Sequence, residues 1–400
     1  MTLEFWFDYS CPYAYLAASA VEALAARARA ELSWQPFLLG GVFRAVGTPQ
    51  KLFATLSAQK AQHNARDLDR WADELGVTLR MPDAHPFRTV EALRATLLTG
   101  CDPRVIHGFY SAYWVGGRPV SAPDTLHDVL SAAGHDAASI VGRLGDARDE
   151  LTRRTDRALA KGVFGAPALV VGDELFWGQD RLPFVERALT GARVELTPPT
   201  TRRPTVPHKL EVFFDFSSPF AYLGCSQVDA VAARTGCDVT WRPFLLGGLF
   251  KAIGQVDVPL NTWSEAKRLY TFKDMMRWAE HWGVPLRFPS RFPTNSLKAL
   301  RLYLALPEAR RDAYRGRVFT AYWAEDRDIT DDGVLRELLG ADADAAFARA
   351  QTPEVKDALK TATEDAAKRG VFGAPTFIVD GEELFWGQDR LGLVEARLRK

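Results

Sequence analysis

LEFWFDYSCPYAYL, at residues 3–16, returns in the second half of the chain as LEVFFDFSSPFAYL, at 210–223. In each copy a run of apolar and aromatic residues typical of a strand precedes a short loop, a proline and an alanine-containing stretch typical of a helix. Proline is tolerated in the first turn of a helix because its missing N–H would have no helical partner there. Each stretch therefore predicts a strand, a loop and a helix that begins near Pro12 or Pro219.

Two further segments repeat in the same order. SWQPFLLGGVFRAVG at 33–47 returns as TWRPFLLGGLFKAIG at 240–254, and KGVFGAPALVVGDELFWGQDRL at 161–182 returns as RGVFGAPTFIVDGEELFWGQDRL at 369–391. The repeat is far longer than the unit of a solenoid. The chain is therefore predicted to be one domain duplicated in tandem, at 1–196 and 209–400, with the Pro- and Thr-rich segment 197–208 as the linker.

The order of predicted elements indicates an α/β fold. Each copy reads as strand, helix and strand, then a mainly helical block (50–160 and 258–368), then two short strands and a last helix. This order suits a small mixed sheet flanked by helices, with further helices inserted midway. In the first copy the strands are expected at Leu3–Phe7, Glu31–Gln35, Leu169–Val171 and Glu174–Trp177; in the second they are expected at Leu210–Phe214, Asp238–Arg242, Phe377–Val379 and Glu383–Trp386.

Composition excludes several classes of protein. The 400 residues are 47% hydrophobic, and 50 basic residues balance 50 acidic ones, so nothing favours nucleic acid or an anionic membrane as a partner. No apolar run is long enough to span a membrane, and the first residues lack the basic start of a secretory signal. Four cysteines and seven histidines show neither a disulfide framework nor metal-ligand spacing. We expect a cytoplasmic protein without a metal.

The residue before Pro12 or Pro219, at the expected start of the helix, is the strongest candidate for a catalytic residue. It is Ser218 in the second copy and Cys11 in the first. A helix N-terminus stabilises a nearby anion, so a hydroxyl there could donate to a bound thiolate, and a thiol there would have a lowered pKa. An N-cap role explains Ser218 equally well at this point.

Two other repeated motifs supply candidates. In GAP, a cis bond before Pro167 or Pro375 would present the carbonyl of Ala166 or Ala374 to a ligand, although most X–Pro bonds are trans. In WGQDRL, the acidic residue could cap a helix or bind an amine. The arginine that follows it could likewise have a structural role or contact a ligand. These residues are Asp180, Arg181, Asp389 and Arg390.

Together, FDFSSPFAYL, VFGAPTF and FWGQDRL resemble the thioredoxin-fold family that groups DsbA-like proteins, kappa-class glutathione transferases and 2-hydroxychromene-2-carboxylate isomerases. The resemblance runs through nearly all of both copies. It implies a thioredoxin-like fold with an all-helical insertion, present twice in tandem, with glutathione bound between the two parts of a domain. It also implies that Ser218 stabilises the glutathione thiolate, that Ala374 before Pro375 pairs with the cysteinyl unit, and that Asp389 holds the γ-glutamyl end.

The helical block of the second copy adds to the resemblance. NTWSEAKRLYTFKDMMRWAEHWGVPLRFP, at 261–289, matches the family pattern, which makes Asn261 and Lys267 ligand-contacting positions of the second copy. Tyr270 and Asp274 would support them from the helix. Lys267 would pair with the glycyl carboxylate or with an acidic substrate; without the resemblance, it would be a solvated helix residue.

The first copy departs from the pattern. Cys11 replaces the serine, Ala54 stands where Asn261 is expected, and His63 stands where Tyr270 is expected. Lys60, Asp67, Pro167, Asp180 and Arg181 are retained. Cys11 lacks the second cysteine of a CxxC pair, so it could act only through mixed disulfides or a distant partner. We therefore expect the second copy to be the catalytic one.

The resemblance points to a glutathione-dependent isomerase that acts on a small aromatic substrate of the 2-hydroxychromene-2-carboxylate type. Three alternatives stay open: a kappa-like transferase that conjugates electrophiles, a DsbA-like thiol protein acting through Cys11, and a glutathione-binding protein without activity. Because relatives pair as dimers, the two copies are expected to pair within one chain, which would then be a monomer.

Overall fold

The computed structural model describes residues 1–50, 55–192, 206–255 and 262–400. The predicted linker at 197–208 lies largely outside these residues, as do Ala54 and Asn261. The chain forms two compact units, each built mainly from one repeat. The first unit comprises Met1–Leu56, Asn64–Leu196 and Ser264–Tyr270; the second comprises Ser57–His63, Thr197–Trp263 and Thr271–Lys400.

The first repeat contains the predicted strands, helical block and final helix. Its elements are β1 (Thr2–Phe7), α1 (Pro12–Arg27), β2 (Glu31–Pro36), α2 (Leu39–Ala45), α3 (Ala58–Leu75), α4 (Val90–Leu98), α5 (Pro103–Trp114), α6 (Pro123–Ala132), α7 (Ala137–Gly142), the 3-10 turn η2 (Leu144–Ala147), α8 (Arg148–Ala160), β3 (Ala168–Val171), β4 (Glu174–Trp177), the 3-10 turn η3 (Gln179–Arg181) and α9 (Leu182–Thr190).

The second repeat has the same order of strands and differs mainly within the helical block. Its elements are β5 (Lys209–Phe214), α10 (Pro219–Thr235), β6 (Asp238–Pro243), α11 (Leu246–Ala252), α12 (Glu265–Trp282), α13 (Leu297–Ala305), α14 (Glu308–Trp323), α15 (Asp332–Leu339), the 3-10 turn η5 (Gly340–Asp342), α16 (Ala343–Ala350), α17 (Pro353–Lys368), β7 (Thr376–Val379), β8 (Glu383–Trp386), the 3-10 turn η6 (Gln388–Arg390) and α18 (Leu391–Leu398).

Each repeat forms one four-stranded mixed sheet, which confirms the predicted α/β class. The strand orders are β2-β1-β3-β4 and β6-β5-β7-β8. The first two strands of each repeat pair in parallel, and the last two pair antiparallel with each other and with the first. The buried side chains on both faces of β1 and β5 agree with central strands covered by helices. In these strand orders, β4 and β8 each lie at one edge of their sheet.

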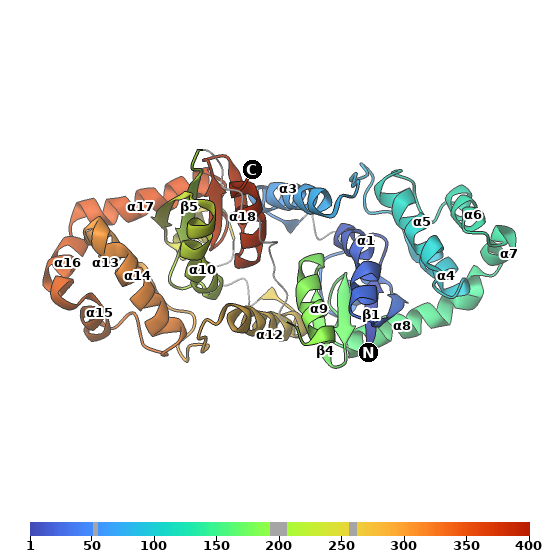
Figure 1. Cartoon of the computed structure of the whole chain (residues 1–400), viewed down its shortest axis with the longest axis horizontal. Coiled ribbons are helices and arrows are strands. Elements are labelled where there is room, and N and C mark those ends of the chain that lie inside the picture. The colour runs from blue at the N-terminus through green and yellow to red at the C-terminus, as the bar shows by residue number, and fades with distance from the viewer. Residues whose placement is uncertain (51–54, 193–205, 256–261) are drawn as a thin grey trace. The chain divides into compact units, whose positions relative to one another are not determined.

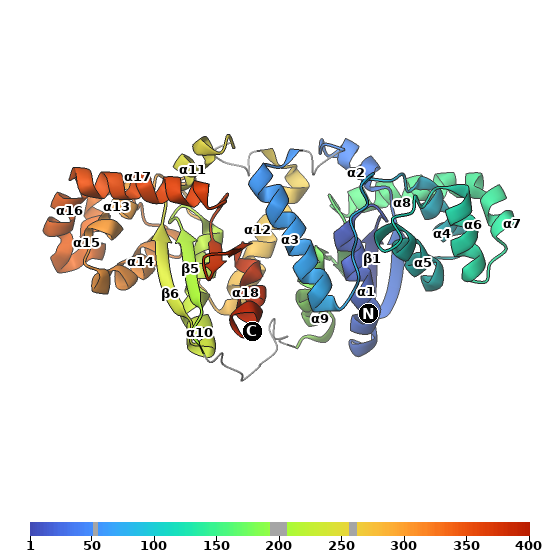
Figure 2. The same ribbon diagram turned by 90° about the horizontal axis from the view of Figure 1, so that it is seen from above.

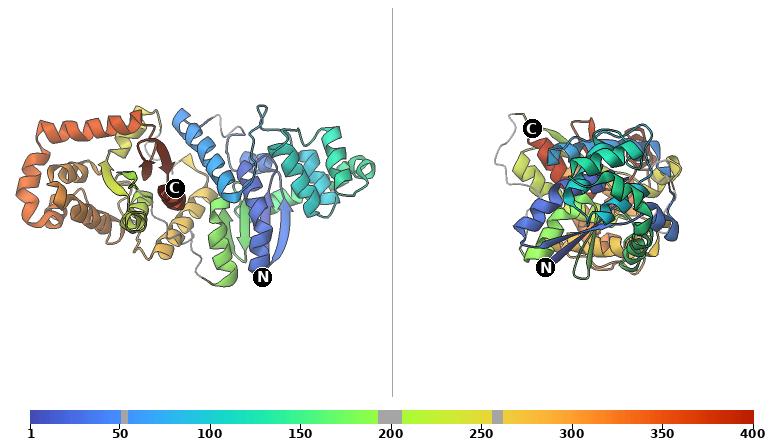
Figure 3. Two further views of the ribbon diagram at one scale, coloured as in Figure 1. Left: turned by 45° about the horizontal axis from the view of Figure 1, so that its top comes forward. Right: turned by 90° about the vertical axis from the view of Figure 1, so that its right-hand side faces the viewer.

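The helical insertion lies to one side of the sheet in each repeat, as Figure 1 shows for α4–α8 and for α13–α17, and Figure 3 shows from other directions. A buried tryptophan ties it to the loop that follows the first strand. Trp114 Nε1 donates to the carbonyl of Tyr9 at 2.9 Å, and Trp323 Nε1 donates to the carbonyl of Phe216 at 2.8 Å. Both tryptophans are fully buried core residues.

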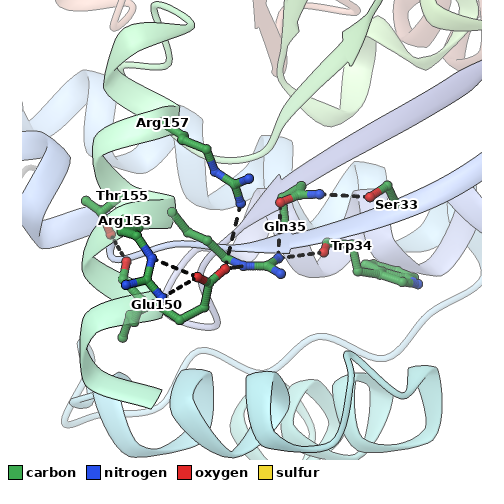
Figure 4. A network of polar contacts seen from close by, with 9 residues as sticks. Ser33, Trp34, Gln35, Glu150, Arg153, Thr155 and Arg157 are labelled. Carbon is green, nitrogen blue, oxygen red and sulfur yellow. Dashed lines mark hydrogen bonds and ion pairs between the residues drawn. The ribbon is translucent and has the colours of Figure 1, made fainter. Parts of the chain in front are cut away.

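In the first unit, polar contacts hold α8 against β2 (Figure 4). Arg154 donates to Glu150 Oε1 at 2.8 Å, to the carbonyl of Trp34 at 3.2 Å and to Gln35 Oε1 at 3.1 Å. Arg153 also donates to Glu150, at 3.0 Å. These hydrogen bonds lower the pKa of the Glu150 carboxyl. The insertion and the sheet are therefore linked by hydrogen bonds from a charged side chain of α8 to β2.

The compact units differ from the repeats by an exchange of two short segments. α3 runs unbroken from Ala58 to Leu75 (Figure 2), yet Ser57–His63 groups with the second unit. Ser264–Tyr270, which includes the start of α12, groups with the first unit. We call Ser57–His63 and Ser264–Tyr270 the exchanged segments. Each contains a lysine and ends on a ring-bearing residue, His63 or Tyr270.

Two features of the described residues bear on the classes of function considered above. No helix in the described ranges is both long and apolar enough to cross a membrane. Within those same ranges, no three His, Cys, Asp or Glu side chains come together in a way that could hold a metal ion.

Candidate active site

The loop after the first strand is held by a buried carboxylate that the sequence analysis did not single out. Asp215 Oδ1 accepts from the backbone N–H of Ser217 at 2.9 Å, and Asp215 Oδ2 accepts from the N–H of Leu246 at 2.7 Å. Asp8 makes the equivalent bonds in the first repeat. Burial raises the pKa of both carboxyls, against the effect of these bonds. The Phe-Asp pair repeated before the loop was the sequence signal from which the role of these aspartates in holding the loop could have been predicted.

Ser218 is the N-cap of α10 and is buried. Its Oγ accepts from the N–H of Ala221 at 3.1 Å and donates to the carbonyl of Ala374 at 2.8 Å. The helix-capping interpretation is therefore confirmed. The hydroxyl has one hydrogen, so an incoming anion could receive it only by displacing the carbonyl of Ala374. This arrangement places a buried donor beside the motif that contains Pro375.

Cys11 occupies the equivalent place at the start of α1. Its Sγ lies 3.0 Å from the carbonyl oxygen of Ala166, to which it donates, and it makes no side-chain cap. Burial raises the pKa of the Cys11 thiol to about 12, although backbone N–H groups of α1 oppose this. The expectation of a lowered pKa is wrong, because removal of the thiol from water outweighs the helix N-terminus.

Cys11 is consequently expected to react slowly with alkylating agents. At pH 8 a thiol of pKa about 12 is thiolate in only about one molecule in ten thousand, against about a quarter for an ordinary cysteine. Iodoacetamide labelling followed by peptide mass spectrometry should show Cys11 modified at least roughly a hundredfold more slowly than in the guanidinium-unfolded chain. Labelling at equal rates in the two states would contradict the burial of this thiol.

Both GAP motifs contain cis peptide bonds, Ala166–Pro167 and Ala374–Pro375. The possibility of a cis bond raised by the sequence is confirmed at both positions. In each case the alanine carbonyl already accepts from the residue at the start of the helix, Cys11 or Ser218. The two candidate motifs therefore meet in each unit.

The WGQDRL motif forms a turn whose acidic residue pairs with the arginine that follows it. Arg390 Nη1 lies 3.2 Å from Asp389 Oδ1, and Arg181 Nη1 lies 3.0 Å from Asp180 Oδ2. Gly387 has φ of 104°, and a Cβ there would lie 2.6 Å from Asp389 Oδ1. Glycine is thus required for the turn that brings the carboxylate and guanidinium together.

The tryptophan of this motif joins it to the GAP loop, a role that sequence reasoning missed. A Cβ on Gly373 would come closer than 3.0 Å to Trp386 Nε1, so the indole rests directly on that backbone. Phe372 packs against the same indole, with ring centroids 5.0 Å apart. In the first unit, a Cβ on Gly165 would likewise lie 2.7 Å from Trp177 Nε1. The identical FWG in both copies was the signal available for it.

In the second unit, the exchanged segment of α3 covers Trp386. The backbone N–H of Trp386, on edge strand β8, donates to His63 Nε2 at 3.1 Å. The Lys60 Nζ lies 5.1 Å from the centroid of the indole ring. Burial lowers the pKa of the Lys60 ammonium. Lys60 and His63, which the sequence assigned to the first copy, therefore line the second unit.

The first unit has the reciprocal arrangement. The backbone N–H of Trp177 donates to Tyr270 Oη at 3.0 Å, and Lys267 Nζ lies 5.5 Å from the Trp177 ring centroid. Lys267, which the sequence assigned to the second copy, therefore contacts an aromatic ring of the first unit. The spacing of residues along one chain cannot tell which of two similar sheets a helix end will cover.

The two units thus offer different chemistry on similar scaffolds. The second unit combines a buried hydroxyl at a helix N-terminus, a half-buried ammonium and a carboxylate–guanidinium pair. The first unit replaces the hydroxyl with a thiol that stays protonated near neutral pH. A hydroxyl donor, a cation and a carboxylate suit a ligand that carries an anionic sulfur, a carboxylate and an amine.

Curated relatives match one repeat rather than the whole chain. A 2-hydroxychromene-2-carboxylate isomerase of Sphingobium xenophagum is 34% identical over 192 residues, which are 47% of this chain and 97% of that protein. Glutathione S-transferase kappa 1 of Homo sapiens is 30% identical over 207 residues, which are 47% of this chain and 90% of that protein.

One solved structure and one family model also match the chain. A structure of 2-hydroxychromene-2-carboxylate isomerase is 30% identical and covers 48% of this chain and 94% of its own, with a TM-score of 0.43. The model of the DSBA-like thioredoxin domain matches residues 2–190 and, separately, residues 209–399. Since the family model matches both repeats, the chain belongs to the family of DSBA-like thioredoxin domains and carries that domain twice.

Proposed function

We propose that the second unit binds glutathione beside Ser218 and catalyses an isomerisation of the 2-hydroxychromene-2-carboxylate type. The observation that carries the proposal is the buried Ser218 hydroxyl, placed at the start of α10 against the carbonyl of Ala374. The names of the relatives, isomerases and kappa-class glutathione transferases, support the same cofactor and enzyme class.

The residues present suit glutathione, which has a thiol, two carboxylates and an amine. Ser218 is the buried donor for the sulfur, and Asp389 with Arg390 offers a charge pair for the amine and carboxylate of the γ-glutamyl end. Trp386 Nε1 is buried and has no hydrogen-bond partner among the described residues. Such a donor is stabilised by a ligand that brings an acceptor.

When bound, glutathione would supply a thiolate that adds to the conjugated substrate and later leaves, so that a former double bond can rotate between the two events. Ser218 keeps the sulfur ionised by donating its single hydrogen to it. The backbone at Ala374 holds the cysteinyl unit, and Asp389 with Arg390 orients the γ-glutamyl end. No proton from Ser218 is consumed, because its hydroxyl acts as a donor and not as the nucleophile.

An assay of two substrates tests the reaction class. The wild-type chain with reduced glutathione should isomerise 2-hydroxychromene-2-carboxylate to trans-o-hydroxybenzylidenepyruvate, and the reaction should stop when glutathione is withheld. Conjugation of a chloronitrobenzene without any isomerisation would instead identify a kappa-like transferase, the second candidate that the relatives support. The high pKa of Cys11 argues against a disulfide oxidoreductase that acts through that residue.

The chain is expected to be a monomer of 44.4 kDa in solution. The reason is the duplication itself, because a second repeat within the chain can take the place that a second subunit has in dimeric relatives. Size-exclusion chromatography with light scattering measures this directly, and a mass twice as large would contradict it. A glutathione-dependent reaction also suits the cytoplasm, where glutathione sets the thiol poise.

A further inference from the structure

A histidine of the first repeat closes the edge of the sheet in the second unit. Because β8 lies at one edge of that sheet, the backbone N–H groups that point outward from it need acceptors from outside the sheet. The N–H of Trp386, the last residue of β8, donates to His63 Nε2 at 3.1 Å. His63 is the last residue of the exchanged segment Ser57–His63, which groups with this unit. The imidazole therefore fastens that segment to the sheet.

The hydrogen bond exists in one charge state of the imidazole. His63 is buried, and its Nε2 can accept only while it carries no hydrogen, so the hydrogen of the neutral ring is on Nδ1. A protonated imidazole carries a hydrogen on both nitrogens, so two donors would face each other and the Trp386 N–H would lose its acceptor. Since an ordinary imidazole changes charge near pH 6.5, we expect the contact to be intact at about pH 8 and to be lost as the pH falls below about 6.

The first unit makes the same contact with a group that does not change charge in this range. The N–H of Trp177 donates to Tyr270 Oη at 3.0 Å. A phenol ordinarily loses its proton only near pH 10, so it can accept throughout. The chain therefore contains an internal control, with His63 at one sheet edge and Tyr270 at the equivalent edge of the other sheet.

Charged groups on the elements that meet at His63 act in both directions. Lys60, one turn earlier on α3, covers the same indole, so its ammonium disfavours a second positive charge there. Asp67, one turn later on α3, favours it. The GAP loop, GVFGAPT at 370–376, has no charged side chain. The acidic groups on and just after β8 are paired with arginines, as Glu383–Arg397 and Asp389–Arg390. The direct bond to the Trp386 N–H is what selects the neutral imidazole.

Loss of this bond reaches the candidate site through two aromatic rings. The indole of Trp386 rests on Gly373, and the carbonyl of the next residue accepts from Ser218 Oγ at 2.8 Å. The His63 ring also packs against Phe372, the residue before that glycine, with ring centroids 5.5 Å apart. An imidazole that leaves β8 therefore loosens both rings that hold this stretch of backbone.

We propose that His63 is a pH-sensitive positioning residue of the second unit. Its neutral imidazole holds Trp386 and the GAP loop in place for the ligand at Ser218, and its protonation releases them. The effect on the ligand rests on the proposed function, whereas the hydrogen bond does not. The site is then fully formed at neutral and alkaline pH and weakened in acid. The first repeat, although it has Cys11 in place of serine, thereby sets the conditions under which the second repeat binds its ligand.

Amide hydrogen exchange tests the hydrogen bond without any ligand. Exchange of the full-length chain is followed by mass spectrometry that resolves single amides, at two pH values, and each rate is divided by that of the same amide in the unfolded chain. Between about pH 8 and about pH 5.5, protection of the Trp386 N–H should fall roughly tenfold, as for a donor that loses its partner. Protection of the Trp177 N–H should change by less than about twofold, because Tyr270 keeps its charge.

Two substitutions at the same position should abolish this pH dependence. His63→Tyr gives the second unit the group that Tyr270 supplies in the first. His63→Gln offers an amide oxygen that accepts at both pH values. Thermal unfolding of each variant at each pH checks that the fold is retained.

Calorimetric titration with reduced glutathione tests the consequence for the site. The thiol of glutathione itself ionises, so wild type and His63→Tyr are compared at each pH, where that contribution is the same for both. At the site that Ser218→Ala weakens, wild type should lose roughly tenfold more affinity than His63→Tyr between about pH 8 and about pH 5.5.

Each possible failure points to a different part of the account. Equal loss of protection at Trp386 and Trp177, or no loss at either, overturns the inference. Equal loss of glutathione affinity in wild type and His63→Tyr overturns the positioning role and leaves the proposed function standing. Absence of glutathione binding at both pH values overturns the proposed function, and hydrogen exchange then still decides whether the bond from Trp386 to His63 responds to pH.

Discussion

Replacement of Ser218 by alanine is expected to lower kcat/KM for 2-hydroxychromene-2-carboxylate by about a hundredfold or more, as for the loss of a preorganised donor in other active sites. The structure shows one buried hydroxyl hydrogen at the start of α10, aimed at the carbonyl of Ala374. Without it, the side chain at this position can no longer donate to a thiolate. The pKa of a bound thiol should rise, because a hydrogen bond to the charged form is lost.

The same substitution also removes a helix cap, so the two effects must be separated. Loss of the bond from Ala221 N–H to Ser218 should cost about 1 kcal/mol of stability. Urea unfolding measures that part, and ultraviolet titration of the bound thiolate measures the other. Ser226→Ala, which removes an exposed hydroxyl from the same helix, is the matched control and should retain activity. Full activity in Ser218→Ala would contradict the assigned role.

Gly373→Ala is expected to lower the free energy of unfolding by about 2 kcal/mol or more, in the range of overpacking substitutions. The new Cβ would come closer than 3.0 Å to Trp386 Nε1. The indole cannot move away freely, because Phe372, His63 and Lys60 pack around it. Displacing it should also disturb the adjacent Ala374 carbonyl, so glutathione affinity should fall together with stability.

Gly316→Ala is the matched control for this substitution. Gly316 lies within α14, where a Cβ would meet nothing within 4 Å. Alanine there should raise stability by up to about 1 kcal/mol through its higher helix propensity. Urea unfolding of the two variants side by side is the measurement. Equal stability of Gly373→Ala and wild type would show that the packing of Trp386 on the GAP loop is loose.

The fold was largely predictable because it depends on local patterns that occur twice. The apolar runs before Cys11 and Ser218 form the central strands, and the prolines after them begin the helices. The closing strands lie within a residue of the expected positions. Such features are encoded within a few neighbouring residues, and the duplication provides an internal check on each of them.

The site was less predictable because its chemistry depends on burial and on distant contacts. The pKa of Cys11 was predicted in the wrong direction, since its place before Pro12 reveals the helix N-terminus but not the loss of water. The contact of Lys267 with Trp177 in the first unit was not predictable, since the repeats are alike and the exchange of helix ends leaves no local signal. Asp215 and Trp386 position the site through partners far away in the sequence.

Calorimetric titration of the purified chain with reduced glutathione, repeated on Ser218→Ala, tests the central claim most directly. The account predicts saturable binding by the wild type at a site of the second unit, weakened in Ser218→Ala. Absence of binding at millimolar glutathione, or binding that Ser218→Ala leaves unchanged, would contradict it.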